Sequence, residues 1–262
     1  MNVSAAAAPL APLAVTGRQT ELGRWLPRHV AQAGLHFNLA GQQAKTLLHD
    51  GHAWQDLGRK LREGTRRALR ADAGFLVHAG FAFVLSEPKK DPLCSLAETI
   101  LECEQAVLAG STPACVLRLG YLYGPHSQDL RAYRKAFALG RPYWAGPRSA
   151  GQFHLHQDDA VSALLAAASK RHAGQTCYAV AGPPLPFMQL MDELARRLGT
   201  RFPLHVPRLA APLMRLIVRQ EHMQQVALAM PPGLPAPLLP GWRPVWADHR
   251  QGLDQVIAAW RR

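Results

Sequence analysis

The chain has 262 residues, 48% of them hydrophobic and 18% charged, a composition that excludes a disordered chain and allows a full core. Thirty Lys and Arg against eighteen Asp and Glu give a formal net charge of +12, which would attract the phosphates of nucleotides or nucleic acids. No apolar run approaches the roughly 20 residues of a membrane-spanning helix. We therefore expect a cytoplasmic protein that does not bind membranes.

Short apolar runs alternate with helical patterns from residue 35 onward, the order typical of βα units that build a parallel sheet. We expect strands at residues 35–40, 74–78 and 114–119, and helices at residues 59–70 and 93–108 between them. This first stretch therefore predicts an α/β core.

Beyond residue 120 the pattern changes. We expect short helices at residues 130–139 and 158–168, a strand at 176–180 and an amphipathic helix at 187–198. The segment 203–244 is rich in proline and has no clear period, which predicts an irregular cap rather than more sheet.

Several segments carry a family resemblance. They are Leu117-Arg-Leu-Gly-Tyr-Leu-Tyr-Gly-Pro125, His156-Gln-Asp-Asp-Ala160, and Gly241-Trp-Arg-Pro244 followed by Gln251-Gly-Leu253. Their order and spacing resemble the extended short-chain dehydrogenase/reductase family, the NAD-dependent epimerase/dehydratases that act on nucleotide sugars and related compounds. Upstream, Asn38-Leu-Ala-Gly41 is similar to that family's fourth strand, and Glu63-Gly-Thr-Arg66 to the helix that follows it.

The resemblance implies a Rossmann-like parallel sheet that lacks its first strands, with a small C-terminal substrate-type domain. We expect residues 1–125 to form the truncated Rossmann-like core, to which residues 150–182 return. Residues 126–149 and 183–262 would form the smaller substrate-type cap.

The N-terminal region allows two alternatives, because the family opens with Gly-x-x-Gly-x-x-Gly well before its fourth strand. In the one that we favour, residues 15–20 and a helix at 21–33 replace the third strand and its helix, so that the N-terminal strand–helix–strand is missing. In the other, Thr16-Gly-Arg-Gln-Thr-Glu-Leu-Gly23 is an altered glycine loop with Thr20 at its middle position, and two strands are missing internally. The middle glycine normally lets the backbone approach a pyrophosphate, which any Cβ obstructs.

The proton-transfer residues of the family are absent. The resemblance implies a reversible hydride transfer. In that reaction a Tyr moves the hydroxyl proton, and a Lys four residues later lowers the pKa of that Tyr. A Ser or Thr orients the substrate. The tyrosines of this chain are followed four residues later by Pro125, Ser127, Phe137, Pro147 and Gly182.

Aligning the helix at residues 93–108 puts Leu96 at the family's Tyr position and Ile100 at its Lys position, and Gly80 stands at the Ser position. We therefore assign no catalytic residue. Substitutes near these positions are conceivable in His78, Cys94, Glu98 and Thr99. His154 and His156 alternate like metal ligands on a strand, but no third ligand is evident, so we expect no metal.

The remaining site predictions follow from the resemblance alone. Tyr123 and Arg148 would line the substrate side of a cleft, although packing is the simpler interpretation of Tyr123 and solvent exposure that of Arg148. NAD or NADP, bound weakly or not at all, would contact residues at the ends of two strands: Leu39, Ala40, Gly41, Leu119, Gly120 and Tyr121.

Three hypotheses for function remain open. The first is a catalytically impaired or inactive family member with weak or no dinucleotide binding, whose partner is a nucleotide or nucleotide sugar. The second is a divergent active oxidoreductase or epimerase, with a true start codon further upstream as one possibility. The third is a regulatory or nucleic-acid-binding Rossmann module, which only the net charge supports. The helices at residues 59–70 and 93–108 also resemble the pair through which the family forms homodimers.

Overall fold

The computed structural model describes residues 13–26, 34–42, 53–140, 146–200, 224 and 226–261. A five-stranded sheet, parallel throughout, has the order β1-β2-β3-β4-β8. Its strands are β1 (Ala14–Thr16), β2 (Leu35–Asn38), β3 (Phe75–Phe81), β4 (Ala114–Leu119) and β8 (Thr176–Ala179). The expected α/β class and Rossmann-like parallel sheet are confirmed.

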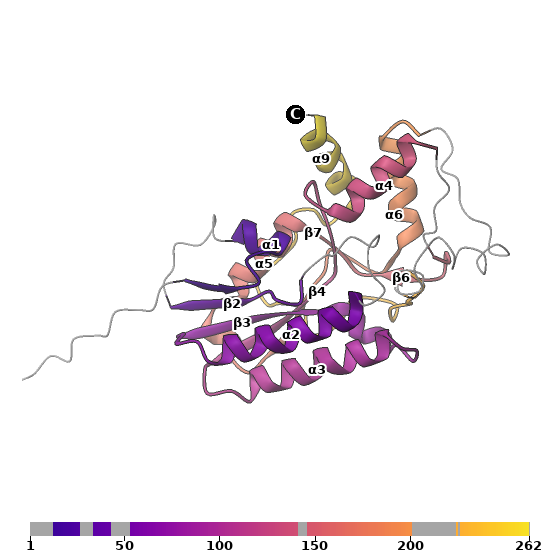
Figure 1. Ribbon diagram of the computed structural model, residues 1–262. Helices are drawn as coiled ribbons and strands as arrows, with labels where there is room; N and C mark the ends of the chain where they lie inside the picture. The colour runs from indigo at the N-terminus through magenta and orange to yellow at the C-terminus, as the bar shows by residue number, and fades with distance from the viewer. Residues whose placement is uncertain are drawn as a thin grey trace, which may run out of the picture.

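Helices cover both faces of the sheet (Figure 1). α2 (Ala53–Leu69) and α3 (Leu93–Leu108) lie on one face, and α1 (Glu21–Trp25) and α5 (Gln157–Ala167) on the other. α3 has the predicted bounds, whereas α2 begins six residues before the expected start because Trp54 and Leu57 extend its apolar face.

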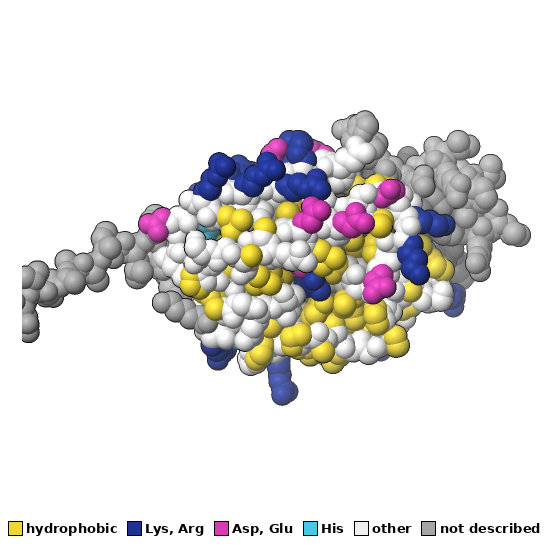
Figure 2. All heavy atoms as spheres, turned by 90° about the horizontal axis from the view of Figure 1, so that it is seen from below, with side chains coloured by type: hydrophobic (Ala, Val, Ile, Leu, Met, Phe, Trp, Pro, Cys, Tyr) yellow, Lys and Arg dark blue, Asp and Glu magenta, His cyan; other side chains and the backbone are white. Residues whose placement is uncertain are grey.

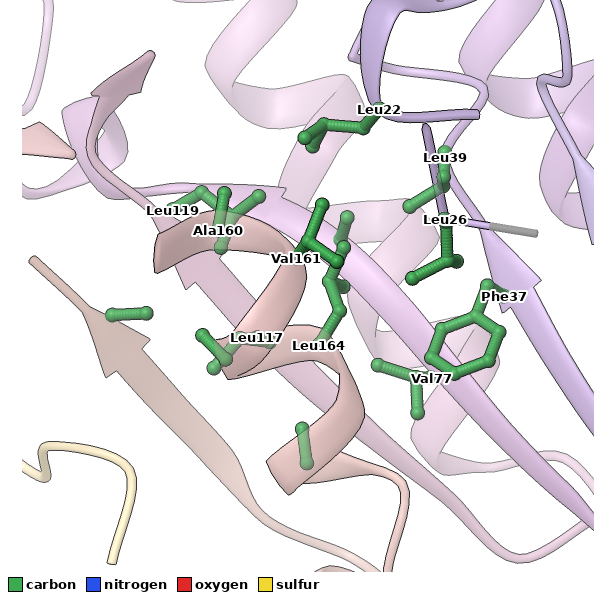
Figure 3. Close-up of a cluster of buried hydrophobic side chains, with 14 of the residues drawn as sticks. Leu22, Leu26, Phe37, Leu39, Val77, Leu117, Leu119, Ala160, Val161 and Leu164 are labelled. Atoms are coloured by element: carbon green, nitrogen blue, oxygen red, sulfur yellow. The ribbon is translucent and has the colours of Figure 1, made fainter. Parts of the chain in front are cut away.

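Alternate residues of each strand enter opposite layers, as the period of a β-strand requires. Phe37 and Val77 pack against α1 and α5, while Leu76 points to the layer of α2 and α3. Figure 3 shows Leu22 of α1 on the same side of the sheet as Val161 and Leu164 of α5. Helices on both faces explain why the strands are hydrophobic almost throughout.

Smaller elements build a second apolar cluster beside the sheet. β5 (Tyr121–Tyr123) pairs with β7 (His154–His156), and β6 (Gly151–Gln152) pairs with β9 (Leu185–Pro186). The cluster is formed by side chains of α4 (Gln128–Ala138), α6 (Phe187–Arg197) and α9 (His249–Arg261). The sequence prediction did not include α9. Two short 3₁₀ helices, η2 (Ala82–Ser86) and η3 (Lys170–His172), complete the elements of the described residues.

The N-terminal register that we favoured is corrected by the strand order. β1 lies directly beside β2 in parallel register, with Val15 opposite Phe37. In a doubly wound sheet of order 3-2-1-4-5-6, the first strand is the neighbour of the fourth, and the third lies at the far edge. β1 therefore takes the place of a first strand. Only residues 26–34 join α1 to β2, too few for a strand–helix–strand, so the missing segment is internal.

Much of the expected proline-rich cap lies outside the described residues, and so does the end of the helix expected at 21–33. Residues 226–248 are described and contain no regular helix or strand, apart from an isolated bridge between Leu238 and Tyr178. In the part of the chain that the structure describes, every helix is too short or too polar to cross a lipid bilayer.

Candidate functional site

The turn after β1 keeps the shape of a glycine loop. Gly17 has φ +88, and a Cβ on it would lie 2.7 Å from the carbonyl carbon of Leu39. A Cβ on Gly23 would lie 2.1 Å from the carbonyl oxygen of Gly17. Both glycines are therefore required by close packing, as the first and last glycines of such a loop are.

Thr20 occupies the middle position of this turn and caps α1. Its Oγ1 accepts a hydrogen bond from the backbone N–H of Gly23 (2.9 Å) and donates one to the carbonyl oxygen of Gly17 (2.7 Å). The hydroxyl thus satisfies a backbone donor at the start of the helix. Thr20 stabilises the turn from within, but its Cβ remains where close approach of a pyrophosphate needs a glycine.

The part of the chain that the structure describes does not include every element of a dinucleotide site. In the Rossmann half, an acidic residue about 20 positions after the glycine loop binds the adenosine ribose. That residue belongs to the strand–helix–strand segment for which residues 26–34 leave no room. We therefore derive no chemical step that depends on a bound NAD(P).

The residues predicted to contact a cofactor lie at the carboxyl ends of β2 and β4, but packing accounts for most of them. Leu39 and Leu119 are buried in the central core. A Cβ on Gly41 would meet the side chains of Leu61 and Phe81, and one on Gly120 would lie 3.0 Å from the carbonyl oxygen of Phe153. Of the predicted set, Tyr121 is partly exposed at this edge.

The positions equivalent to the family's Tyr and Lys lie in an apolar cluster. Leu96 is 3% exposed and Ile100 is fully buried, and both pack in one cluster with Leu61 of α2 and Val84 of η2. Neither side chain can donate or accept a proton. These two side chains therefore pack between α2, α3 and η2.

A buried ion pair takes up the space next to Gly80. A Cβ on Gly80 would lie 2.3 Å from Oε1 of Glu104 and 3.2 Å from Cγ of Arg118. Arg118 donates to Glu104 from Nη2 (2.6 Å) and from Nε, and its Nη1 donates to the hydroxyl of Tyr178. Burial raises the pKa of the Glu104 carboxyl, and Arg118 opposes that shift. No serine fits at Gly80 unless this pair moves.

His78, the conceivable substitute for the family's base, is fully buried, and its partner Asn38 also donates to Thr65 of α2. Its Nδ1 accepts a hydrogen bond from the side-chain amide of Asn38 (2.9 Å). Burial lowers the pKa of His78 to about 4, so its ring is neutral near pH 7. His78 and Ala79 point to opposite faces, as expected from the strand period.

The other conceivable substitutes lie along α3. The thiol of Cys94 is 3.7 Å from Oε1 of Glu98, and burial is the main cause that raises the pKa of Cys94. The Thr99 hydroxyl donates to the carbonyl oxygen of Ser95 and accepts from Arg62. These contacts are internal to α3 or join it to α2.

The two residues predicted for the substrate side have different environments. Tyr123 is fully buried, its ring packs edge-on against His156 (5.3 Å between centroids), and a Cβ on Gly252 would lie 2.2 Å from its hydroxyl oxygen. Burial raises the pKa of Tyr123. Arg148 is exposed. The structure thus places Tyr123 in the packing of the second cluster and Arg148 at the surface.

The His156-Gln-Asp-Asp segment joins distant parts of the chain. Nδ1 of His156 accepts a hydrogen bond from the backbone N–H of Asp158 and so caps α5. The carboxylate of Asp159 accepts from the backbone N–H groups of Val245 (2.7 Å) and Trp246 (2.9 Å). Among the described residues, no group of His, Cys, Asp and Glu could hold a metal ion.

The sequence analysis missed one pair of side chains at this edge. The hydroxyl of Tyr121 donates to Oδ2 of Asp129 (3.0 Å), and burial raises the pKa of the Asp129 carboxyl to about 6. Asp129 lies in the first turn of α4, where an acidic residue is ordinary. No sequence pattern marked Asp129 as a site residue, because its partner Tyr121 lies on a different element, β5.

The strand order, the helices on both faces and the loop after β1 define the class of fold. It is the Rossmann-like fold of NAD(P)-dependent epimerases and reductases of the extended short-chain dehydrogenase/reductase type. The resemblance seen in the sequence is thus confirmed at the level of fold. No family model matches the sequence.

Three solved structures illustrate the likeness. RMD from Pseudomonas aeruginosa, complexed with NADPH, is 18% identical with a TM-score of 0.68; the match covers 95% of this chain and 99% of that one. The human epimerase family protein SDR39U1 (isoform 2) with NADPH is 15% identical with a TM-score of 0.73, covering 95% and 99%. UDP-glucose 4-epimerase from Thermotoga maritima with UDP-glucose is 12% identical with a TM-score of 0.65, covering 95% and 98%.

A curated relative is similar in sequence. The 3-diazoavenalumate denitrifying reductase from Streptomyces sp is 30% identical over 159 residues, which are 60% of this chain and 51% of the relative. The chain spans about half the length of the curated relative that it matches.

Proposed function

We propose that this chain is a member of the extended short-chain dehydrogenase/reductase family that has lost the family's hydride chemistry and binds NAD or NADP weakly or not at all. The observation that carries this proposal is the burial of Leu96 and Ile100 at the Tyr and Lys positions, in the cluster between α2, α3 and η2. Proton transfer there requires a phenol and an ammonium, and neither aliphatic side chain can replace them.

The incomplete nucleotide side supports weak cofactor binding. Thr20 stands at the middle position of the turn, and the segment that would hold the adenosine ribose is missing between α1 and β2. Contacts to the adenosine would therefore be lost together with close approach to the pyrophosphate.

Two measurements test this proposal. NADH and NADPH are titrated into the purified protein while nicotinamide fluorescence is followed, and turnover of UDP-glucose and of NADPH is assayed separately. We expect no tight binding and no turnover above the protein-free rate. Tight saturable binding of NADPH, or epimerisation of UDP-glucose at an ordinary enzymatic rate, would show that the proposal is incorrect.

A divergent active reductase is the second candidate, and the sequence match to a curated reductase favours it. It predicts NADPH oxidation in the presence of a suitable acceptor. Replacing Tyr121, a polar residue at this edge of the sheet, should then abolish the NADPH oxidation. That loss would distinguish this candidate from the first.

A nucleotide or nucleotide sugar is the partner that we propose for the sheet edge where β2 and β4 end, because solved structures of this fold contain UDP-glucose. We also propose the domain division set out from the sequence. Residues 1–125 with 150–182 form the core, and residues 126–149 and 183–262 form the cap. The two separate apolar clusters are in keeping with this division.

A homodimer through α2 and α3 is supported by the charges of these helices. The exposed positions of α2 include Arg59, Arg62 and Arg66, whereas those of α3 include Glu98 and Glu102. Figure 2 shows the lower face of the molecule, with basic side chains along its upper edge and acidic side chains beside them. Arg62 pairs with Glu102 and Arg59 with Glu63 within the chain, so a two-fold axis would extend these existing ion pairs.

Sedimentation equilibrium tests the dimer. A monomer throughout the micromolar range would exclude it. Nucleic-acid binding through the exposed arginines of α2 is the remaining possibility. It predicts that the affinity for nucleic acid falls steeply as the salt concentration rises.

A further inference from the structure

We propose that the aromatic-lined carboxyl of Asp129 is a binding site for the protonated amine of a small ligand. The site lies where β4 ends and β5 begins, beside the first turn of α4. The inference does not depend on the loss of hydride chemistry or of dinucleotide binding.

A cluster of aromatic rings lies beside this carboxyl, joined to it through Tyr121. Tyr121 donates its hydroxyl to Asp129 (3.0 Å), and Tyr133 lies one turn further along α4. Both tyrosine rings pack edge-on against Phe187 at the start of α6, with centroids 5.3 and 5.8 Å apart. Tyr121 also packs edge-on against His154 of β7 (5.8 Å). A carboxylate next to aromatic rings suits an organic ammonium group, which carboxylates and aromatic rings both attract.

No cation balances Asp129. Among the described residues, no Lys, Arg or His forms an ion pair with it, in a chain with thirty Lys and Arg. The two nearby arginines of α4 are engaged elsewhere: Arg131 donates to the carbonyl oxygen of Pro125, and Arg134 lies over the ring of Trp260.

The neighbouring titratable groups do not supply the charge either. Burial lowers the pKa of His154 to about 3 and also lowers that of His249, so both rings are neutral near pH 7. Burial raises the pKa of Tyr133, which therefore keeps its proton. Among the described residues, the hydrogen bond shown to the carboxyl of Asp129 comes from a neutral donor, the Tyr121 hydroxyl.

This environment makes Asp129 respond to a ligand's charge. Burial raises the pKa of Asp129 to about 6, because a carboxylate without a cation loses solvation there. An ammonium group beside it would favour the charged carboxylate. Asp129 remains partly exposed, so a small ligand can reach it. Binding should therefore strengthen as pH rises through about 6 and release a proton below that pH.

The test uses two probes of the same size, benzylamine and benzyl alcohol, titrated calorimetrically into the full-length protein at several pH values. Benzylamine is protonated throughout this range. We expect saturable binding of benzylamine that strengthens between pH 5 and pH 7, on either side of the pKa of about 6, and weaker or no binding of benzyl alcohol.

The matched variants are Asp129→Asn and Asp158→Asn. Asp158 is also an aspartate in the first turn of a helix, α5, and is exposed. We expect Asp129→Asn to weaken benzylamine binding about tenfold or more, and Asp158→Asn to leave it unchanged. Circular dichroism checks that both variants fold, and if Asp129→Asn does not, proton release by the unmodified protein decides the question.

Three results would overturn the proposal. They are equal binding of the alcohol, benzylamine affinity that is independent of pH, and the absence of saturable benzylamine binding. The NADPH titration is a separate measurement, so failure of this inference is distinguishable from failure of the proposed function.

Discussion

Replacing Gly80 with serine would introduce the side chain that the sequence alignment predicts for the family at this position, and we expect it to destabilise the protein. The added Cβ would lie 2.3 Å from Oε1 of Glu104, closer than any real Cβ contact, and 3.2 Å from Cγ of Arg118. Glu104 cannot turn away freely, because Arg118 holds it through Nη2 at 2.6 Å and through Nε. The new side chain must therefore shift a buried ion pair.

The expected loss of stability in Gly80→Ser can be bracketed by two known effects. Overpacking a core costs about 1–3 kcal/mol, and breaking a buried ion pair costs about 3–5 kcal/mol. A partly displaced pair lies between these ranges, so we expect Gly80→Ser to lower the free energy of unfolding by about 2–4 kcal/mol. Urea denaturation followed by circular dichroism measures this change.

Gly182→Ser is the matched control, because the nearest atom to a Cβ there is 3.9 Å away. It should change the unfolding free energy by about 0.5 kcal/mol or less. In a Glu104→Ala background, the cost of Gly80→Ser should shrink, since the clashing atom is gone. A Gly80→Ser protein as stable as the unmodified chain would refute this account of the position.

Three further predictions concern Asp129, His154 and Thr20. The folded-state pKa of Asp129 is raised from 3.8 to about 6, so its contribution to stability is present at low pH and is lost as pH rises between these values. Asp129→Asn should therefore raise the free energy of unfolding at pH 7 by about 1–3 kcal/mol, measured in urea, and should have little effect at pH 4. The folded-state pKa of His154 is lowered from 6.5 to about 3, so stability is lost as pH falls below 6.5. His154→Phe should make the melting temperature less sensitive to acid between pH 7 and pH 4, and an unchanged acid sensitivity would contradict the burial of a neutral ring. Thr20→Gly restores the middle glycine but removes a helix cap, which costs a few tenths of a kcal/mol for glycine. We expect it not to restore NADPH binding, measured by fluorescence, because the adenosine segment is still missing; tight binding would show that the cap residue alone blocks the cofactor.

Local sequence patterns predicted only part of the candidate site. The aliphatic residues at Leu96 and Ile100 were evident from spacing along one helix, because positions four apart share a face. The pairing of Tyr121 with Asp129 was not, since it joins a strand to a helix through a turn. The space beside Gly80 was also hidden, because Glu104 and Arg118 come from α3 and β4.

The sequence by itself determined the α/β class and the bounds of α3 and β4, and it showed that no tyrosine is followed four residues later by a lysine. These depend on local hydrophobic periodicity and on residue identity. Only the tertiary structure decided that β1 lies next to β2, and therefore that the missing segment is internal. Strand order depends on which edges pair in space, and a three-residue strand such as β1 carries too short a pattern to reveal its neighbour.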